Sequence, residues 1–500
     1  MQEIIQSFFR ERSLVNHQIA SFDDCIPTGD GRLSRMEKIV RAIRVGTDEE
    51  VDVDDGGIIK LDVIDLDIVV RMKNIQLGTP IIREANGSEH ESTPMECRLR
   101  KLTYMSPVQV DFTIYRNGVP SPPEKSVTVG NLPIMVRSRR CNLHPNHLAG
   151  DRVLNPNVSE EDRKMAYDLW RRNGEDPLDP GGYFIINGTE RVLISMEDLA
   201  PNRVTVELNK RYKKKTELAK IFSQKEGVRK PLSVEKRRDG MLMAKISTAG
   251  SAVIPVVLLM RALGVENDQE IFQAIAGPTE TFKFIVANIN EVKDNKEYEV
   301  ETTEEAHLWL EKKFAQGQQR EYREARVIQL LDRELLPHLG DSEDDRKKKA
   351  IFLGRIVRQV LEMAITDRQP NDKDHYANKR VRLAGDLFED LFRVSLNGLA
   401  RDLKYQLERH HNRKRELKIQ SCLRPDVMTS KIMHALATGN WVGGRSGVSQ
   451  LLDRTTYIAT LSHMRRVTSP LVRSQPHFEA RDLHPTQWGR LCPNETPEGQ

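Results

Sequence analysis

The segment around position 187 constrains the fold of this chain more than any other. Residues 183–186 and 189–195 are extended, mostly apolar runs, and the dipeptide Asn187-Gly188 stands between them. Such a dipeptide favours the two-residue turn of an antiparallel hairpin, because both of its positions tolerate a positive φ. The sequence DPGG at 179–182 interrupts any regular element before the first run. We therefore predict a β-hairpin that starts after a break in the chain.

Further extended segments precede this hairpin. Residues 58–72 alternate in part between apolar and acidic side chains, which is typical of a strand with one solvated face. Residues 108–115 form another extended run, Asn-Gly at 117–118 is a second hairpin turn, and residues 126–136 extend again. The first part of the chain is therefore predicted to be rich in β-sheet.

Helical periodicity dominates later in the chain. Residues 350–366 and 388–407 carry apolar side chains three and four positions apart, which predicts two amphipathic helices. Thr429 and Gly439 are placed to start and stop a third, short helix. Together with the strands, these helices predict a multidomain α+β fold with mixed and antiparallel sheets.

Composition excludes several classes of protein. The longest apolar run, residues 253–260, is far below the roughly 18 residues that a membrane span needs. The chain has 5 cysteines without a C-x-x-C pair, so it supports neither a disulfide framework nor a zinc ribbon. We expect a cytoplasmic protein with no membrane segment.

The distribution of charge says more than its sum. The formal net charge is only +4, but residues 203–239 hold thirteen Lys or Arg against five Asp or Glu. Residues 48–67 hold nine acids and one lysine. A molecule with separate basic and acidic faces can offer the basic one to a polyanion.

Common catalytic patterns are missing from the sequence. It contains no G-x-x-x-x-G-K-[ST], no H-E-x-x-H and no G-x-S-x-G, and no G-x-G-x-x-G opens a helix after a strand. If the chain takes part in catalysis, we expect the metal ligands on another polypeptide.

Long strings along most of the chain carry a more specific signal. The hairpin reads GGYFIINGTERVLI at 181–194, and residues 372–385 read DKDHYANKRVRLAG. Residues 439–467 read GNWVGGRSGVSQLLDRTTYIATLSHMRRV, and residues 481–500 read RDLHPTQWGRLCPNETPEGQ. With residues 94–104 and 132–138, these strings resemble, in the same order, the second-largest (beta-type) subunit of multisubunit DNA-directed RNA polymerases. The amino-acid sequence of these strings is most similar to the archaeal and eukaryotic branch of the family.

The resemblance implies a domain plan. It predicts the first part of the protrusion at 1–202, an inserted lobe at 203–382, the second part of the protrusion at 383–435, and the fork with the start of the active-centre region at 436–500. Because the family's subunit normally continues beyond ETPEG, the chain resembles the N-terminal half of a split archaeal subunit; a cloned fragment would look the same.

The resemblance also implies an activity and its partners. The complete enzyme would extend RNA on a DNA template from nucleoside triphosphates, with Mg²⁺ as its metal. The family's metal-binding NADFDGD-like string belongs to the largest subunit and is absent here, so no cofactor is expected on this chain alone. Expected partners are the C-terminal half of the subunit, the largest and smaller subunits, the DNA template and the RNA product.

The resemblance makes nine residues candidates for contact with nucleic acid. They are Arg445, Gln450, Asp453, His463, Arg465, Arg466, Glu498, Lys379 and Arg380.

Each candidate has a simpler alternative. The glycines around Arg445 suit a loop that probes a duplex, but also an ordinary surface loop. Asp453 could instead pair with an arginine, whereas Arg466 is favoured as a phosphate contact. Lys379 and Arg380 could contact phosphate or form a solvated helix start. Basic residues at 210–215 are expected on the lobe, near downstream DNA.

Two other functions stay open at this stage. The chain could be a stand-alone nucleic-acid-binding scaffold without a role in polymerisation, or a purely structural protein whose charge only keeps it solvated.

Overall fold

The described chain has two separate apolar cores, and each contains residues that are distant in sequence. Unit 1 comprises Met1–Glu197 and Val381–Leu471, and unit 2 comprises Asp198–Arg380 and Val472–Gln500. The computed structural model describes residues 2–11, 13–27, 32–46, 56–63, 66–148, 160–209, 216–225, 227–246, 253–317, 319–366, 368–471 and 478–496. The predicted domain boundaries and the names protrusion, lobe and fork stay predictions.

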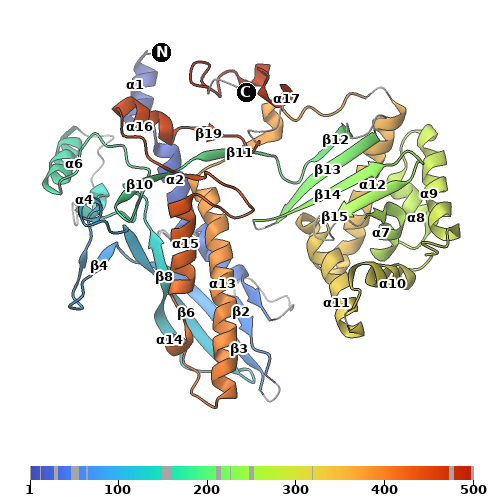
Figure 1. The fold of residues 1–500 in the computed structure, drawn as a ribbon, viewed down its shortest axis with the longest axis horizontal. Helices are drawn as coiled ribbons and strands as arrows, with labels where there is room; N and C mark the ends of the chain where they lie inside the picture. The colour runs from blue at the N-terminus through green and yellow to red at the C-terminus, as the bar shows by residue number, and fades with distance from the viewer. Residues whose placement is uncertain are drawn as a thin grey trace. The chain divides into compact units, whose positions relative to one another are not determined.

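The larger sheet of unit 1 is almost entirely antiparallel (Figure 1). Its order is β1-β2-β3-β6-β7, with β8 also paired to β6, and only β1 and β2 run parallel. The strands are β1 (Arg44–Val45), β2 (Gly57–Lys60), β3 (Ile68–Leu77), β6 (Met105–Arg116), β7 (Val119–Pro120) and β8 (Glu124–Pro133). Along β6 buried side chains alternate with partly exposed ones, as expected for a strand with one face on the core.

Helices pack against this sheet and supply much of the core. They are α2 (Asn16–Cys25), α3 (Arg35–Ala42), α13 (Ala384–Asn412), α14 (Ile419–Cys422) and α15 (Asp426–Thr438). The ring of Phe22 lies 5.4 Å from those of Phe184 and Phe388, edge to face. This aromatic cluster joins α2, α13 and the predicted hairpin through geometry that rings favour.

The predicted hairpin is present and carries the residues of interest. Strands β9 (Phe184–Ile186) and β10 (Thr189–Leu193) are antiparallel, and β10 also pairs with β18 (Ser449–Leu451). Asn187 and Gly188 have φ of 50° and 77°, as the turn requires. Helix α16 (Tyr457–Met464) follows β18 in the sequence.

Shorter elements complete the described part of unit 1. They are α1 (Gln2–Glu11), β4 (Ile81–Arg83), β5 (Glu89–Glu91), α4 (Pro94–Leu99), α5 (Pro145–Leu148) and α6 (Glu160–Arg172). A small sheet has the order β17-β11-β19, from β11 (Ser195–Leu199), β17 (Lys379–Arg382) and β19 (Val467–Thr468). Two of the sequence boundaries between the units fall within β11 and β17.

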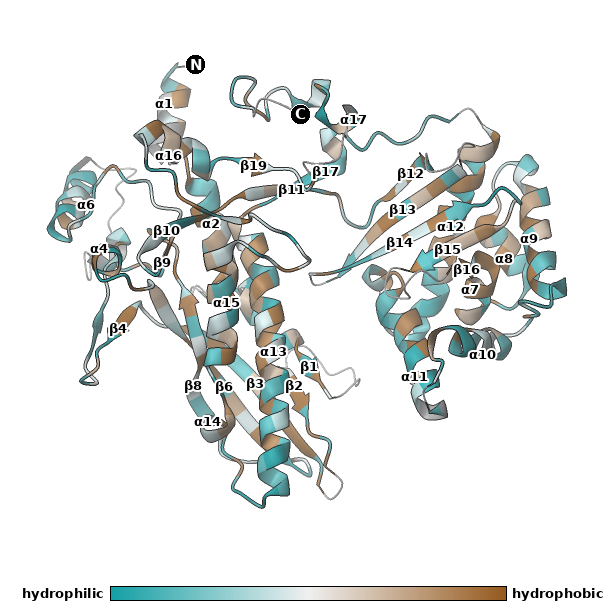
Figure 2. Ribbon diagram, in the orientation of Figure 1, coloured by the Kyte–Doolittle hydropathy of each residue, from teal (hydrophilic) through white to brown (hydrophobic). Residues whose placement is uncertain are grey.

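Unit 2 is an antiparallel sheet with helices around a second core. The sheet order is β12 (Val204–Asn209), β13 (Thr216–Lys225), β14 (Val228–Lys236), β15 (Leu242–Ile246) and β16 (Ile254–Pro255). The helices around this core are α7 (Val256–Ala262), α8 (Asp268–Ile275), α9 (Phe282–Asp294), α10 (Thr303–Phe314), α11 (Arg320–Gln329) and α12 (Arg346–Ile365). The short helix α17 (Phe478–Arg481) follows later in the chain. Every residue of α7 is buried, and the helix is strongly apolar in Figure 2.

The fold class predicted from the sequence, a multidomain α+β protein with mixed and antiparallel sheets, is confirmed. Two local predictions are wrong. Residues 58–72 form two strands, β2 and the start of β3, rather than one run. Thr429 lies inside α15, where its Oγ1 donates to Pro425 O; the helix starts earlier because Pro425 suits its N-terminus. No described helix is long and apolar enough to cross a membrane.

The crossing of α2 and α13 generates a stability prediction. A Cβ on Gly385 would lie 1.9 Å from Ser21 O, a backbone atom that cannot move aside cheaply. Gly385→Ala should therefore lower the free energy of unfolding by about 1 to 3 kcal/mol, measured by urea denaturation of the whole chain.

Gly398→Ala in the same helix is the matched control. Its Cβ would meet only Lys431 Nζ, at 3.9 Å. Alanine should stabilise that position by about 0.5 to 1 kcal/mol, because glycine is the poorer helix former. Equal effects of the two substitutions would contradict the close crossing.

Candidate nucleic-acid interface

Residues 450–466 begin at β18, which pairs with the hairpin, and continue into the capped helix α16. Leu452 N donates to Glu190 O at 2.9 Å and extends the pairing of β18 with β10. Thr456 caps α16 through its Oγ1, which accepts the Ala459 N–H at 3.1 Å. The short segment between them therefore has fixed ends.

Three predicted site residues meet in one hydrogen-bonded cluster. His463 is only 4% exposed, and its Nδ1 accepts the Asp453 N–H at 3.1 Å. Its Nε2 therefore carries the proton and donates to Gln450 Oε1, 3.0 Å away. Burial, with a smaller effect of Arg466, lowers the pKa of His463, which favours this neutral ring. The structure thus directs polar atoms of all three residues toward one another.

The Asp453 carboxylate has backbone partners instead of an arginine partner. Its Oδ1 accepts the Thr455 N–H at 2.9 Å. Hydrogen bonds from Thr455, and the charge of Arg466, lower the pKa of Asp453. It forms no ion pair with any described residue, so the alternative of a structural Asp–Arg pair is not what the structure contains.

The two adjacent arginines differ in their surroundings. The Arg465 guanidinium donates to Leu14 O, two residues before α2 begins. Arg466 is exposed, and its side chain makes no hydrogen bond or ion pair within the described chain. Arg466 is thus a cation with free hydrogen-bonding capacity beside the cluster.

The loop that carries Arg445 is closed at its base. Trp441 is 5% exposed, its N–H donates to Arg445 O at 2.7 Å, and its indole donates to Leu387 O at 2.9 Å. Gly443 and Gly444 have φ of 82° and 73°, so glycine is needed there for the backbone conformation.

The Arg445 side chain interacts with other groups of unit 1. It is half-buried and lies in the field of Asp390. Burial raises the pKa of Asp390, against the opposing charges of Arg382 and Arg445.

The other predicted residues are not brought to this cluster by the described geometry. Lys379 and Arg380 belong to unit 2: Lys379 Nζ lies 3.7 Å from Asp374 Oδ1, and Arg380 Nη1 donates to Ala377 O at 3.0 Å. Glu498 and the basic run at 210–215 lie outside the described residues.

Charge on the unit 2 sheet is largely paired. The described pairs are Lys220–Glu207 at 2.5 Å, Lys225–Asp341 at 2.7 Å, Arg229–Asp198 at 3.0 Å and Lys236–Glu217 at 3.2 Å. The excess of basic residues in this stretch therefore overstates the free positive charge of the sheet.

Arg454 is not among the residues predicted from the sequence, although it lies between the site candidates Asp453 and His463. Its guanidinium donates to both carboxylate oxygens of Glu190 and to Asp179 Oδ2. No periodicity relates positions 264 residues apart; the available signal was the placement of Glu190 and Asp179 at the predicted hairpin.

A cluster of possible metal ligands exists away from this segment. Glu84, His90 and Glu96 each offer a ligand atom within 4.8 Å of the others. However, Arg100 Nη1 donates to Glu84 at 2.6 Å and to Glu96 at 2.8 Å. Because a guanidinium already binds both carboxylates, the cluster does not fit a catalytic divalent ion.

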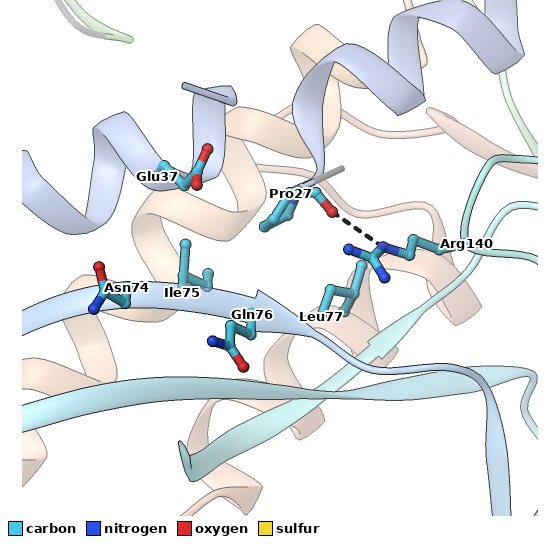
Figure 3. A pocket seen from close by; sticks show the side chains of 7 residues that line it. All are labelled: Pro27, Glu37, Asn74, Ile75, Gln76, Leu77 and Arg140. Carbon is cyan, nitrogen blue, oxygen red and sulfur yellow. Dashed lines mark hydrogen bonds between the residues drawn. The ribbon is translucent and has the colours of Figure 1, made fainter. Parts of the chain in front are cut away.

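Figure 3 shows a pocket of about 390 Å³ in unit 1. Its lining residues are Pro27, Glu37, Asn74, Ile75, Gln76, Leu77 and Arg140. Arg140 Nε donates to Pro27 O at 3.1 Å, and Glu37 caps the start of α3 through Ser34. Its two charged groups thus serve the fold.

Comparison with known proteins gives consistent matches along the chain. Residues 13–151 match the family described as RNA polymerase beta subunit. Residues 200–382 match RNA polymerase Rpb2, domain 2, and residues 450–500 match RNA polymerase Rpb2, domain 3.

Individual relatives extend the similarity to nearly the whole chain. It is 44% identical over 502 residues to DNA-directed RNA polymerase subunit Rpo2N of Methanococcus vannielii, covering 99% of this chain and 92% of that relative. It is 43% identical to Rpo2N of Methanocaldococcus jannaschii, covering 100% and 92%. Against subunit Rpo2 of Saccharolobus shibatae, identity is 41%, with 99% of this chain but only 40% of that longer relative covered.

The neutral state of His463 predicts a pH effect on stability. Its pKa in the folded chain lies below the unfolded value of 6.5. The unfolded chain therefore takes up the proton first as the pH falls below 6.5, which destabilises the fold. Thermal melts should show that His463→Gln costs about 1 kcal/mol at pH 7.5, through weakened hydrogen bonds, and less at pH 5.5. A gap between the two proteins that widens on acidification would contradict a neutral His463.

Proposed function

Since the chain belongs to the family of the second-largest subunits of DNA-directed RNA polymerase, we propose that its residues 445–466 face nucleic acid in the assembled enzyme. That enzyme is a nucleotidyltransferase, and this chain corresponds to the N-terminal part of the subunit. The observation that carries the proposal is Arg466, an exposed cation without a hydrogen-bonded partner in the described chain, next to an ordered cluster.

The described residues divide the work between contact and support. Arg466 neutralises a phosphate of the nucleic acid, for which a guanidinium offers a planar set of donors. His463, Gln450 and Asp453 hold the turn on which it stands through the bonds at 3.0 and 3.1 Å. Arg445 approaches the duplex from the closed glycine loop, while Arg465 serves mainly to fix the same turn to α2.

The wider assignment follows the family matches. We assign the protrusion to 1–202 and 383–435, the lobe to 203–382 and the fork to 436–500, together forming one side of the DNA cleft. The Rpb2 domain 2 and domain 3 matches at 200–382 and 450–500 support the last two. Lys379, Arg380 and Glu498 are additional contacts in this proposal, as is the basic run at 210–215.

Other chains complete the enzyme in the same proposal. They are the C-terminal half of the subunit, the largest subunit and the smaller subunits, with template DNA and product RNA. We place Mg²⁺ on another subunit, because both carboxylates of the one described cluster of metal-capable groups are already bound by Arg100. We also assign the enzyme to the cytoplasm. A stand-alone nucleic-acid-binding scaffold is not favoured, since the similar proteins are named as polymerase subunits.

Replacing Arg466 tests the proposed contact. In a reconstituted polymerase bound to an RNA–DNA scaffold, Arg466→Ala should shorten the lifetime of the complex. It should also reduce the slope of log affinity against log salt by about 0.7 to 0.9, the value for one lost phosphate contact.

Arg409→Ala is the matched charge control. Arg409 is also exposed, lies in the last turn of α13, and has no side-chain partner among the described residues. It should leave lifetime and slope unchanged. Identical behaviour of both variants, with intact assembly, would contradict a specific role for Arg466.

A further inference from the structure

A charged network links the hairpin to the segment that precedes α16. Glu190 Oε1 accepts from Arg98 Nε and from Arg454 Nη2, both at 2.8 Å, and its Oε2 accepts from Arg454 Nε at 2.5 Å. The Glu190 side chain is 16% exposed. Both arginines bind this one carboxylate, and charge-assisted hydrogen bonds to a poorly hydrated carboxylate are strong. The Arg454 side chain itself is 38% exposed.

A second carboxylate and a tyrosine fix the orientation of Arg454. Arg454 Nη2 donates to Asp179 Oδ2 at 3.1 Å, and the same oxygen accepts the Tyr183 hydroxyl at 2.6 Å. The guanidinium carbon lies 4.9 Å from the centre of the Tyr183 ring. Burial opposes ionisation of Asp179, but the charge of Arg454 and the Tyr183 hydrogen bond keep its pKa below the ordinary value. Arg454 is thus held from three sides.

A short chain of hydrogen bonds connects Arg454 to the proposed nucleic-acid contact, Arg466. Asp453 is the residue before Arg454; its N–H donates to His463, and its C=O accepts the Thr460 hydroxyl at 2.6 Å. Arg466 in turn donates its backbone N–H to His463 O at 3.4 Å. A displacement of Arg454 would therefore move both ends of α16.

We propose that Arg454 is a positioning residue that, by binding Glu190 and Asp179 of the hairpin region, sets the place of α16 and of Arg466 for their contact with nucleic acid. The role rests on the function proposed above for Arg466. Arg454 itself is committed to protein carboxylates, so it acts through Arg466 and does not touch the nucleic acid.

A double-mutant cycle in the reconstituted polymerase tests this role. Arg454→Gln should shorten the lifetime of the scaffold complex about fivefold and lower the salt slope toward that of Arg466→Ala. In the Arg466→Ala background the same substitution should change the lifetime less than twofold, because the group that it positions is already gone. Arg454→Lys keeps the charge but not the paired donors, and should fall between wild type and Arg454→Gln.

A control separates loss of a generic ion pair from loss of position. Arg424 pairs with both oxygens of Asp402 in the same unit, before α15. Arg424→Gln removes the same charge and the same kind of pair without touching residues 450–466, and should leave the lifetime unchanged. Effects of Arg454→Gln and Arg466→Ala that simply add, or an Arg454→Gln enzyme with normal lifetime, would overturn the positioning role.

Hydrogen exchange distinguishes failure of this role from failure of the proposed contact. In the assembled enzyme, Arg454→Gln should accelerate amide exchange in residues 453–464, where the Asp453 N–H is protected by His463. Unchanged exchange would overturn the positioning role even if Arg466→Ala weakens binding. Faster exchange, with no effect of Arg466→Ala on the complex, would instead reject the contact.

Discussion

The side-chain amide of Gln18 holds unit 1 together at the point where its distant segments meet. Gln18 is fully buried, and its Nε2 donates to Leu193 O at 3.1 Å and to Met464 O at 3.2 Å. Its Oε1 accepts the Ala384 N–H at 3.2 Å. A buried amide left without these partners would cost about 1 to 3 kcal/mol, so the four segments are required together. One side chain of α2 thereby fixes the hairpin, the start of α13 and the end of α16.

This arrangement explains why so few of the charged side chains are available to a ligand. In residues 450–466 polar groups are used to join the segment to the rest of unit 1: His463 binds Gln450 and Asp453, and Arg465 binds Leu14. Arg466 is the exception beside them. Charged groups of the unit 2 sheet are also used within the fold, because strand lysines pair with neighbouring carboxylates. Affinity for a polyanion would then depend on a few unpaired cations rather than on total charge.

Sequence predicted the parts of the fold that local chemistry determines. The Asn187-Gly188 turn and the left-handed Gly439 after α15 follow from backbone preferences, and both are present. Thr429 is not the helix cap that its position predicts, because its hydroxyl binds the backbone at Pro425 and Asn131 instead. Long-range geometry, such as the close crossing at Gly385, has no local signal.

The candidate site could be predicted only in part from the sequence, for the same reason. The sequence string at 439–467 predicted that residues 450–466 belong to the site, but not which of their side chains face inward. His463 is buried because β18 and the capped α16 bring it against Gln450 and Asp453. Arg454 could not be assigned, since its partners lie on the hairpin far away in the sequence.

We propose above all that the Arg466 side of this turn lies against nucleic acid in a working polymerase. A photoreactive amino acid placed at position 466 in an actively extending complex tests it most directly, with the same group at position 409 for comparison. We expect a crosslink to RNA or DNA from position 466 and none from position 409. A crosslink from position 466 to protein alone, in complexes that still extend RNA, would contradict it.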